Sequence, residues 1–115
     1  MECIFCKISK GEIKSRKIYE NKNFFSIFDI NPVSEGHSLV ISKEHFENFL
    51  DLRNNLGDDL IECVKETISI IKKEKPFEGF NLVNNNSEVA GQIVKHFHLH
   101  IIPRRKGEKL KSHLF

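Results

Sequence analysis

Residues 96–103 place a histidine at every second position of a short apolar run. Successive side chains of a β-strand point to opposite faces of the sheet. In a strand, therefore, His96, His98 and His100 share one face, and the apolar side chains between them share the other. Packing explains three imidazoles on one face poorly, because buried ring nitrogens need hydrogen-bond partners. The pattern predicts a strand whose histidines bind a metal, attack a substrate, or do both.

The bulk composition is that of a folded protein of ordinary size. The chain has 115 residues, of which 39% are hydrophobic, and this predicts a single domain over residues 1–115 with a core of its own. A net charge of +2 is too small to indicate a nucleic-acid partner. No apolar run is long enough for a membrane span, and the N-terminus lacks the pattern of a signal peptide. Three cysteines are an odd count that argues against a disulfide framework, so we expect a cytoplasmic protein with reduced thiols.

Hydrophobic patterning and turn residues divide the chain into strands and two helices. Residues 21–23 form a turn between the first two strands, which predicts a hairpin. Ser42 is a suitable N-cap for a short helix. The expected strands are 17–20, 24–30, 36–42, 79–84 and the histidine run, the expected helices are 43–50 and 54–75, and residues 103–115 form a basic C-terminal tail. This succession is typical of an α+β domain with a mainly antiparallel sheet, one long helix and one short helix.

The long helix over residues 54–75 has a single apolar stripe, and Pro76 ends it. The residues of the stripe are Leu56, Leu60, Ile61, Val64, Ile68 and Ile71. Cys63 lies inside this helix without a nearby cysteine, so we interpret it as a small core hydrophobe.

Cys3 and Cys6 form a CxxC pair, the spacing of structural zinc knuckles. Two further ligands are needed, and His45 with one histidine of the 96–100 run could complete a Cys2His2 set. Redox dithiols share this spacing, although they usually follow a strand, and none is expected before Cys3. Structural zinc and unbound or redox cysteines both stay open on the residues alone, as does a catalytic zinc on the histidine run.

The histidine run also suits nucleophilic catalysis. A neutral imidazole is a good nucleophile near pH 7 when its far nitrogen is hydrogen-bonded, donors meet the developing charge, and an acid protonates the leaving group. Histidines two positions apart in a strand lie roughly 6–7 Å from each other and can share these tasks. The preceding loop, residues 85–92, is rich in amides, and Gly91 permits close approach of the backbone to an anionic oxygen.

Residues 90–104 resemble the signature of the histidine triad (HIT) family, in which three histidines alternate with hydrophobic residues. Further segments agree in order along the chain, from residue 3 to about residue 104: 3–6, 28–30, 36–41, 43–45 and 84–85. The resemblance is closest to the zinc-binding bacterial type of the Hint-like branch. It implies an α+β fold with an antiparallel sheet, a homodimer, and hydrolysis or transfer of nucleotidyl groups at the α-phosphate of purine nucleotides, often as a phosphoramidase that releases AMP.

The resemblance also implies roles for individual residues. His98 would be the nucleophile that forms a covalent nucleotidyl-histidine, while His100 and His37 would orient it and contact the phosphate. Asp29 would bind the ribose hydroxyls, and Ile30 and Leu39 would lie near the base. Asn85 and Gln92, with the loop backbone at Gly91, would hold phosphate oxygens. The ligands of a structural zinc would be Cys3, Cys6, His45 and His96.

Position 93 departs from the family pattern. Relatives usually carry Ser or Thr after the glutamine of the loop, whereas this chain has Ile93. The resemblance implies that the missing hydroxyl would help the leaving group or a phosphate oxygen, so we expect altered turnover. The activity that the resemblance implies is hydrolysis of AMP-type phosphoramidates. The alternatives are a dinucleoside polyphosphate hydrolase, a nucleotidyl transferase, or a zinc-stabilised nucleotide-binding protein with little turnover.

Overall fold

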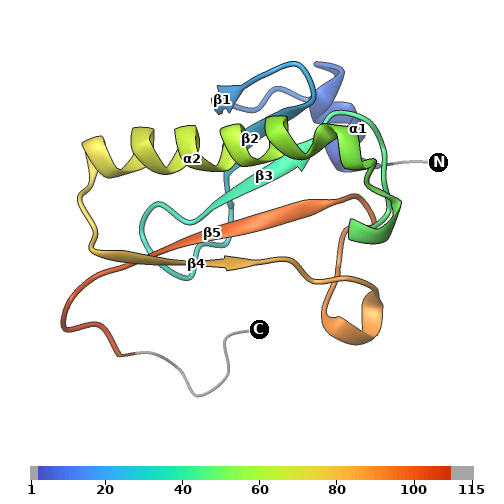
Figure 1. The fold of residues 1–115 in the computed structure, drawn as a ribbon. Coiled ribbons are helices and arrows are strands. Elements are labelled where there is room, and N and C mark those ends of the chain that lie inside the picture. Colours follow the sequence, from blue (N-terminus) through green and yellow to red (C-terminus); the bar gives the residue numbers. More distant parts are fainter. Residues whose placement is uncertain (1–2, 110–115) are drawn as a thin grey trace.

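The computed structural model describes residues 3–109 and contains one five-stranded antiparallel sheet (Figure 1). The order of the strands in the sheet is β1-β2-β3-β5-β4. The strands are β1 (Lys17–Glu20), β2 (Phe24–Phe28), β3 (Ser38–Ser42), β4 (Gly79–Val83) and β5 (His98–Arg104). The α-helices are α1 (Ile4–Ser9) and α2 (Gly57–Glu74), and short 3-10 turns span Phe49–Asp51, Asn54–Leu56 and Glu88–Ala90. The predicted α+β class is confirmed.

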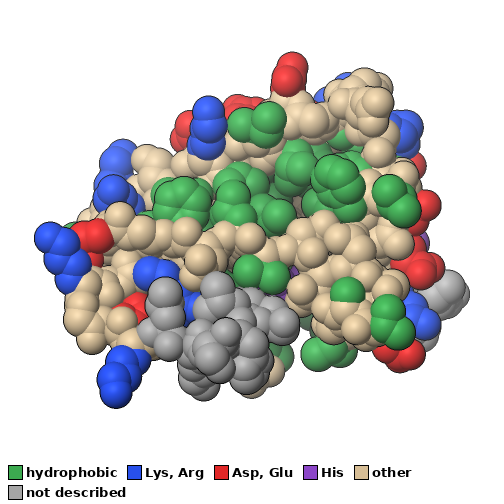
Figure 2. Space-filling view, turned by 60° about the horizontal axis from the view of Figure 1, so that its bottom comes forward, with side chains coloured by type: hydrophobic (Ala, Val, Ile, Leu, Met, Phe, Trp, Pro, Cys, Tyr) green, Lys and Arg blue, Asp and Glu red, His purple; other side chains and the backbone are tan. Residues whose placement is uncertain are grey.

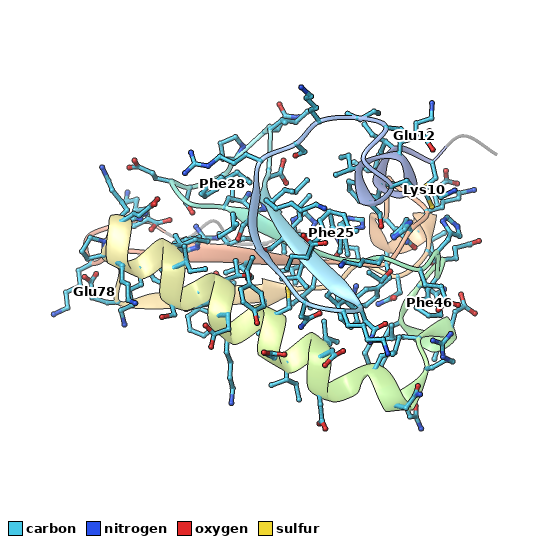
Figure 3. The ribbon with its side chains drawn as sticks, turned by 90° about the horizontal axis from the view of Figure 1, so that it is seen from above. Lys10, Glu12, Phe25, Phe28, Phe46 and Glu78 are labelled. Carbon is cyan, nitrogen blue, oxygen red and sulfur yellow. The ribbon has the colours of Figure 1, made fainter. Side chains whose placement is uncertain are left out.

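The two helices lie on opposite faces of the sheet, as the view from above shows (Figure 3). Against α2 pack the strand residues Phe24, Val40 and Ile101, together with Phe97 just before β5. Against α1 pack the alternate residues of β2 and β3, among them Phe25, Ile27, Leu39 and Ile41. The strict alternation of β2 and β3 thus fills two cores, because every second side chain points to the other face. On β5, His98 and His100 point to the α1 side.

Helix α2 forms as its apolar stripe predicts. Leu56, Val64 and Ile71 are buried against the sheet, whereas Ile61 is 54% exposed at the edge of the stripe. Cys63 is fully buried beside this stripe, which confirms its interpretation as a core residue, and burial raises the pKa of its thiol to about 11.

Two strands are shorter than the sequence predicts, because a tight loop joins them. β2 ends at Phe28 and β3 begins at Ser38. Between them Gly36 adopts a φ of +92°, and a Cβ at this position would lie 2.9 Å from Cγ2 of Ile71. The loop therefore folds back closely under the end of α2, where a side chain has no room.

The prediction of a short helix over residues 43–50 is wrong; the short helix of the structure is α1, at the CxxC pair. A helix over 43–50 would need the Phe46 carbonyl to accept from the Leu50 N–H. Instead that carbonyl accepts from the N–H of Phe97, and the Leu50 N–H donates to Oδ1 of Asn48. Pairing with the segment before β5 thus replaces helical hydrogen bonds.

The chain stays ordered past the predicted start of the C-terminal tail. Pro103 and Arg104 belong to β5, and the guanidinium of Arg104 donates to Oδ1 of Asn81 on β4. The end of the predicted tail, residues 110–115, lies outside the described residues. Within residues 3–109, no helix is long and apolar enough to cross a membrane.

Candidate functional site

A cavity of about 420 Å³ opens on the α1 side of the sheet. His98 and His100 of β5 lie in its wall with Asp29 and the loop residues Gly91 and Ile93. Its apolar lining comes from α1 and the facing strands and includes Phe5, Ile8, Ile27, Leu39 and the labelled Phe28 (Figure 3). Ile30 also lines the cavity, although 91% of its surface is exposed. Such a mostly apolar cavity with a few convergent polar groups suits a flat, partly polar ligand.

His98 has the geometry of an imidazole with one nitrogen free to react. Its Nδ1 lies 2.8 Å from the carbonyl oxygen of His96, which can only accept, so Nδ1 carries the proton. Nε2 then keeps its lone pair. Asn84 donates to the carbonyl of His98 at 2.9 Å and fixes the start of β5. Burial lowers the pKa of His98, which keeps the ring neutral near pH 7.

His100 and His37 form a pair behind His98. His37 Nε2 lies 2.9 Å from His100 Nδ1, and Oδ2 of Asp29 lies 3.4 Å from the same Nε2. Burial lowers the pKa of His37, although the Asp29 carboxylate opposes this shift. Burial also lowers the pKa of His100 to about 4, reinforced by the neighbouring His98 and His37. Both rings are therefore neutral hydrogen-bonding groups at pH 7.

The predicted substrate residues divide into two groups. Asp29, Ile30, Leu39 and Gly91 lie in the wall of the cavity with His98 and His100. Oδ1 of Asp29 accepts from the N–H of Asn31, which leaves Oδ2 turned toward the histidines. His37 touches this group through its ring but is not part of the cavity wall. The cavity therefore brings together residues from β2, β3, β5 and the loop before β5.

Gln92 lies outside the cavity wall and is 4% exposed. Its side-chain oxygen accepts from the N–H of Ser87, and its nitrogen donates to the carbonyls of Glu47 and Val94. Asn85 is also outside the wall, and its side-chain nitrogen lies 3.7 Å from the place where a Cβ on Gly91 would be. In this structure Gln92 holds the loop in shape, and Gly91, at a φ of +97°, presents its backbone to the cavity.

The second cluster is formed by the four residues predicted as zinc ligands, Cys3, Cys6, His45 and His96, whose ligand atoms all lie within 4.8 Å of one another. His96 Nδ1 lies 3.3 Å from Cys3 Sγ and 3.1 Å from His45 Nδ1, and Cys6 Sγ lies 3.2 Å from His45 Nδ1. Tetrahedral zinc with bonds of about 2.0–2.3 Å needs ligand atoms roughly 3.3–3.8 Å apart. The separations of 3.1, 3.2 and 3.3 Å in this cluster lie at or just below that range.

The donor chemistry of this cluster also fits a metal. His96 Nε2 lies 2.6 Å from the carbonyl oxygen of Ser42, so Nε2 carries the proton and the Nδ1 lone pair faces the cysteines. Burial lowers the pKa of His96 to about 4, so the ring is unprotonated at neutral pH. The cluster therefore could hold a metal ion with two thiolates and two neutral imidazoles.

Several positioning groups escaped the sequence analysis. The carbonyl of Ser42 and the N–H of Val33 each bind a histidine ring nitrogen. Both are backbone groups, which cannot be recognised from the type of residue that carries them. The side chain of Asn84 could have been noticed, since it stands in the polar segment 84–87 beside the predicted phosphate-binding residues.

Comparison with known proteins identifies the family. Residues 10–107 match the HIT domain. An uncharacterised HIT-like protein of Methanocaldococcus jannaschii is 46% identical over 106 residues, which cover 92% of this chain and 81% of the relative. The adenosine 5′-monophosphoramidase of Schizosaccharomyces pombe is 40% identical over 108 residues, which cover 94% of this chain and 78% of the relative.

A solved structure leads to the same assignment. The crystal structure of a member of the HIT family from Bacillus subtilis superposes with a TM-score of 0.86 at 41% identity and covers 98% of this chain and 84% of that one. The motif resemblance and the predicted fold class are thus confirmed together. The chain belongs to the histidine triad family of HIT-domain proteins.

Proposed function

We propose that this protein hydrolyses nucleoside 5′-phosphoramidates and releases the nucleoside monophosphate, with AMP derivatives as its substrates. The observation that carries the proposal is the hydrogen bond from His98 Nδ1 to the carbonyl of His96, 2.8 Å long, which leaves Nε2 as a nucleophile. The name of the fission-yeast relative, an adenosine 5′-monophosphoramidase, supports this substrate class.

The reaction would run in two displacements at the α-phosphorus. His98 Nε2 forms a bond to phosphorus as the P–N bond breaks, and the amine leaves with the bonding electron pair and takes a proton from solvent. Water then attacks the phosphorus of the nucleotidyl-histidine and releases a proton to solvent as the bond to Nε2 breaks. This releases the monophosphate and returns the lone pair to Nε2. His100 and the Gly91 backbone lie where they can meet charge on the phosphoryl oxygens.

The cavity offers matching places for the rest of the nucleotide. The carboxylate of Asp29 suits the ribose hydroxyls, because an ionised carboxylate accepts two hydrogen bonds. The apolar side chains of Ile30 and Leu39 suit the faces of a purine ring. Asn85 and Gln92 would serve the phosphate indirectly, by shaping the loop at Gly91.

We propose zinc as the metal of the cluster formed by Cys3, Cys6, His45 and His96, in a structural role. Four protein ligands close the coordination sphere, which is the character of a structural site and leaves no position for substrate. When bound, zinc would cross-link α1 to the segments that precede β5 and follow β3.

We also propose a homodimer that joins two sheets through β4. β4 is an edge strand, yet Phe80 and Leu82 on it are 46% and 48% exposed. Ile61 of α2 is also exposed, and Figure 2 shows hydrophobic side chains gathered in a band across one face of the molecule. Exposed apolar edges are uncommon in monomers, because they promote pairing with another chain.

The first experiment is incubation with adenosine 5′-phosphoramidate, with AMP release followed for the wild type and His98→Ala. We expect release from the wild type and a loss of at least about a thousandfold in the variant, which still binds AMP. Intact-protein mass after an alkaline quench tests the covalent intermediate, since a bond from imidazole nitrogen to phosphorus survives alkali.

A second candidate function is nucleotide binding with little turnover, which Ile93 favours. This side chain lines the cavity and is 91% exposed where relatives usually supply a hydroxyl. Tight AMP binding without release from the phosphoramidate or from a dinucleoside polyphosphate would select this function. Release from the polyphosphate but not from the phosphoramidate would select the dinucleotide hydrolase.

A further inference from the structure

A chain of hydrogen bonds leads from the backbone to the edge of the cavity. The N–H of Val33 donates to Nδ1 of His37 at 3.1 Å, and His37 Nε2 lies 2.9 Å from Nδ1 of His100. His37 is 2% exposed, so water does not compete for these contacts. His100 then lies in the cavity wall beside His98.

The hydrogen bond from the Val33 N–H fixes the position of the ring proton on both His37 and His100. A neutral imidazole has one N–H and one lone pair, and a backbone N–H can only donate. Nδ1 of His37 must therefore accept, and the proton of His37 lies on Nε2. Two acceptors face that proton, Nδ1 of His100 and, at 3.4 Å, Oδ2 of Asp29. Because Nδ1 of His100 accepts, its own proton lies on Nε2.

We propose that His37 is a positioning residue that stays neutral and acts through His100: the Val33 amide sets the tautomer of His37, and His37 sets that of His100. His100 then presents Nε2–H as a hydrogen-bond donor to the phosphoryl group, and no proton is transferred along the chain. The inference rests on the proposed function. In this role His37 needs only a hydrogen-bond donor at Nε2, and its ring does not change charge during the reaction.

The same geometry argues against a cation at this place. Asp29, His37 and His100 offer ligand atoms within 4.8 Å of one another, as a metal site would. A metal on Nε2 of His37 would need the lone pair of that nitrogen, but the neutral ring has its single lone pair on Nδ1, where Val33 already donates. Hydrogen bonding, not metal binding, therefore accounts for the cluster.

Two substitutions of His37 separate a fixed donor from an acid or base. His37→Gln keeps an N–H group near the position of Nε2 but cannot ionise, whereas His37→Leu removes the donor. We expect the glutamine variant to keep kcat within about tenfold of the wild type with an unchanged pH profile. The leucine variant should lose about a hundredfold or more, as when one donor to a developing oxyanion is removed. Equal losses in both variants, or a pH profile that loses one limb in His37→Gln, would overturn the proposal.

The tautomers themselves can be measured without any turnover. Nitrogen-15 NMR of labelled histidine distinguishes a ring nitrogen with a proton from one with a lone pair. In the wild type we expect the proton on Nε2 of both His37 and His100. Val33→Pro removes the backbone N–H and should leave His37 as a mixture of tautomers, whereas Val33→Ala trims the same side chain, keeps the N–H and should match the wild type.

The two readouts separate the possible failures. If the wild type releases no AMP, the proposed function fails, while the tautomers still test the hydrogen-bond chain. If it turns over but His100 carries its proton on Nδ1, or if Val33→Pro and Val33→Ala give the same spectrum, this inference fails and the proposed function stands.

Discussion

His96 and His98 stand two residues apart, yet they use opposite ring nitrogens for opposite tasks. His96 carries its proton on Nε2, which donates to the Ser42 carbonyl, and aims Nδ1 at the cysteines. His98 carries its proton on Nδ1, which donates to the His96 carbonyl, and keeps the Nε2 lone pair. At the scale of single residues, the backbone around each ring thus decides which nitrogen keeps its lone pair, at the proposed metal site for His96 and at the proposed nucleophile for His98.

His100 contributes to a pH dependence of the free energy of unfolding. Its pKa is about 4 in the folded protein against an ordinary value of 6.5. Between these values the unfolded chain binds a proton that the folded protein does not, so stability falls as pH drops from 6.5 toward 4. Above pH 6.5 this contribution is constant. In His100→Gln we expect the slope of unfolding free energy against pH to be smaller by up to about 1.4 kcal/mol per pH unit in that window.

Urea unfolding of the metal-free wild type and His100→Gln between pH 4 and 8 measures this slope. Comparing the two proteins cancels the titration of the shared groups that do not contact His100. Equal slopes would show that His100 does not resist protonation in the folded protein.

Gly36 is the backbone position where a side chain is least tolerated. In Gly36→Ala, the Cβ would lie 2.9 Å from Cγ2 of Ile71 and 3.1 Å from Cγ of Pro103, at a φ of +92°. We expect a loss of about 2–4 kcal/mol of unfolding free energy from strain and overpacking. Gly57→Ala is the matched control, since nothing lies within 4 Å of its Cβ in the first turn of α2. It should be neutral or stabilise by up to about 1 kcal/mol. Chemical denaturation measures both changes, and similar values would contradict the prediction.

At the scale of elements, α1 contributes both to the proposed metal site and to the wall of the cavity. Cys3 caps this six-residue helix and Cys6 lies within it, while Phe5 on the same helix lines the cavity. The ring of Phe5 lies edge-on to His96 at 5.8 Å and to His98 at 5.2 Å between centroids. A helix this short is not stable alone, so its place depends on the core and on the cysteines. One wall of the cavity is therefore tied to the proposed metal site.

Removal of the metal should consequently weaken nucleotide binding as well as stability. After chelation we expect a lower melting temperature and AMP affinity reduced by a factor within about 5–150, the usual range of coupling between two sites. AMP should raise the affinity for cobalt(II), used as a spectroscopic probe, by the same factor.

The control for this experiment is Cys6→Ala, which lacks one ligand from the start. Its AMP affinity should match that of the chelated protein and should not respond to chelator. A fall in melting temperature with unchanged AMP affinity would show that the metal stabilises the fold without holding the cavity wall.

At the scale of the whole molecule, the two faces of the sheet differ in the residues that they contain. The α2 face contains the larger core, and the α1 face contains both histidine clusters. The edge strand β4 carries exposed Phe80 and Leu82 beyond the cavity. Self-association through this edge would therefore leave the opening of the cavity to substrate.

Leu82→Lys should turn the proposed dimer into a monomer, because a lysine on each edge places like charges opposite one another and removes apolar contact area. Val89→Lys is the control, since Val89 is 99% exposed but lies in the loop before β5 and not on β4. Light scattering after size exclusion measures the mass. A monomeric wild type at micromolar concentration, or a dimer in both variants, would contradict this interface.

Much of the fold and of the site follows from local properties of the sequence. The period-two histidines predict the strand that carries His98 and His100, although β5 begins at His98 and leaves His96 just before it. The apolar stripe predicts α2, and Asn21 predicts the first hairpin, where its side chain accepts from the N–H groups of Asn23 and Phe24. The four proposed zinc ligands could be selected with help from the family resemblance, because cysteine and histidine are residue types that commonly bind zinc.

Tertiary structure decided what depends on contacts between distant segments. Residues 43–50 are not a helix because the Phe46 carbonyl binds Phe97, and the Gln92 amide turns inward because Ser87, Glu47 and Val94 satisfy it there. The proton positions on His37, His96 and His98 depend on backbone groups. Every residue except proline carries the same backbone N–H and C=O, so the sequence by itself supplied the imidazoles, and only the folded chain determined which nitrogen of each carries the proton.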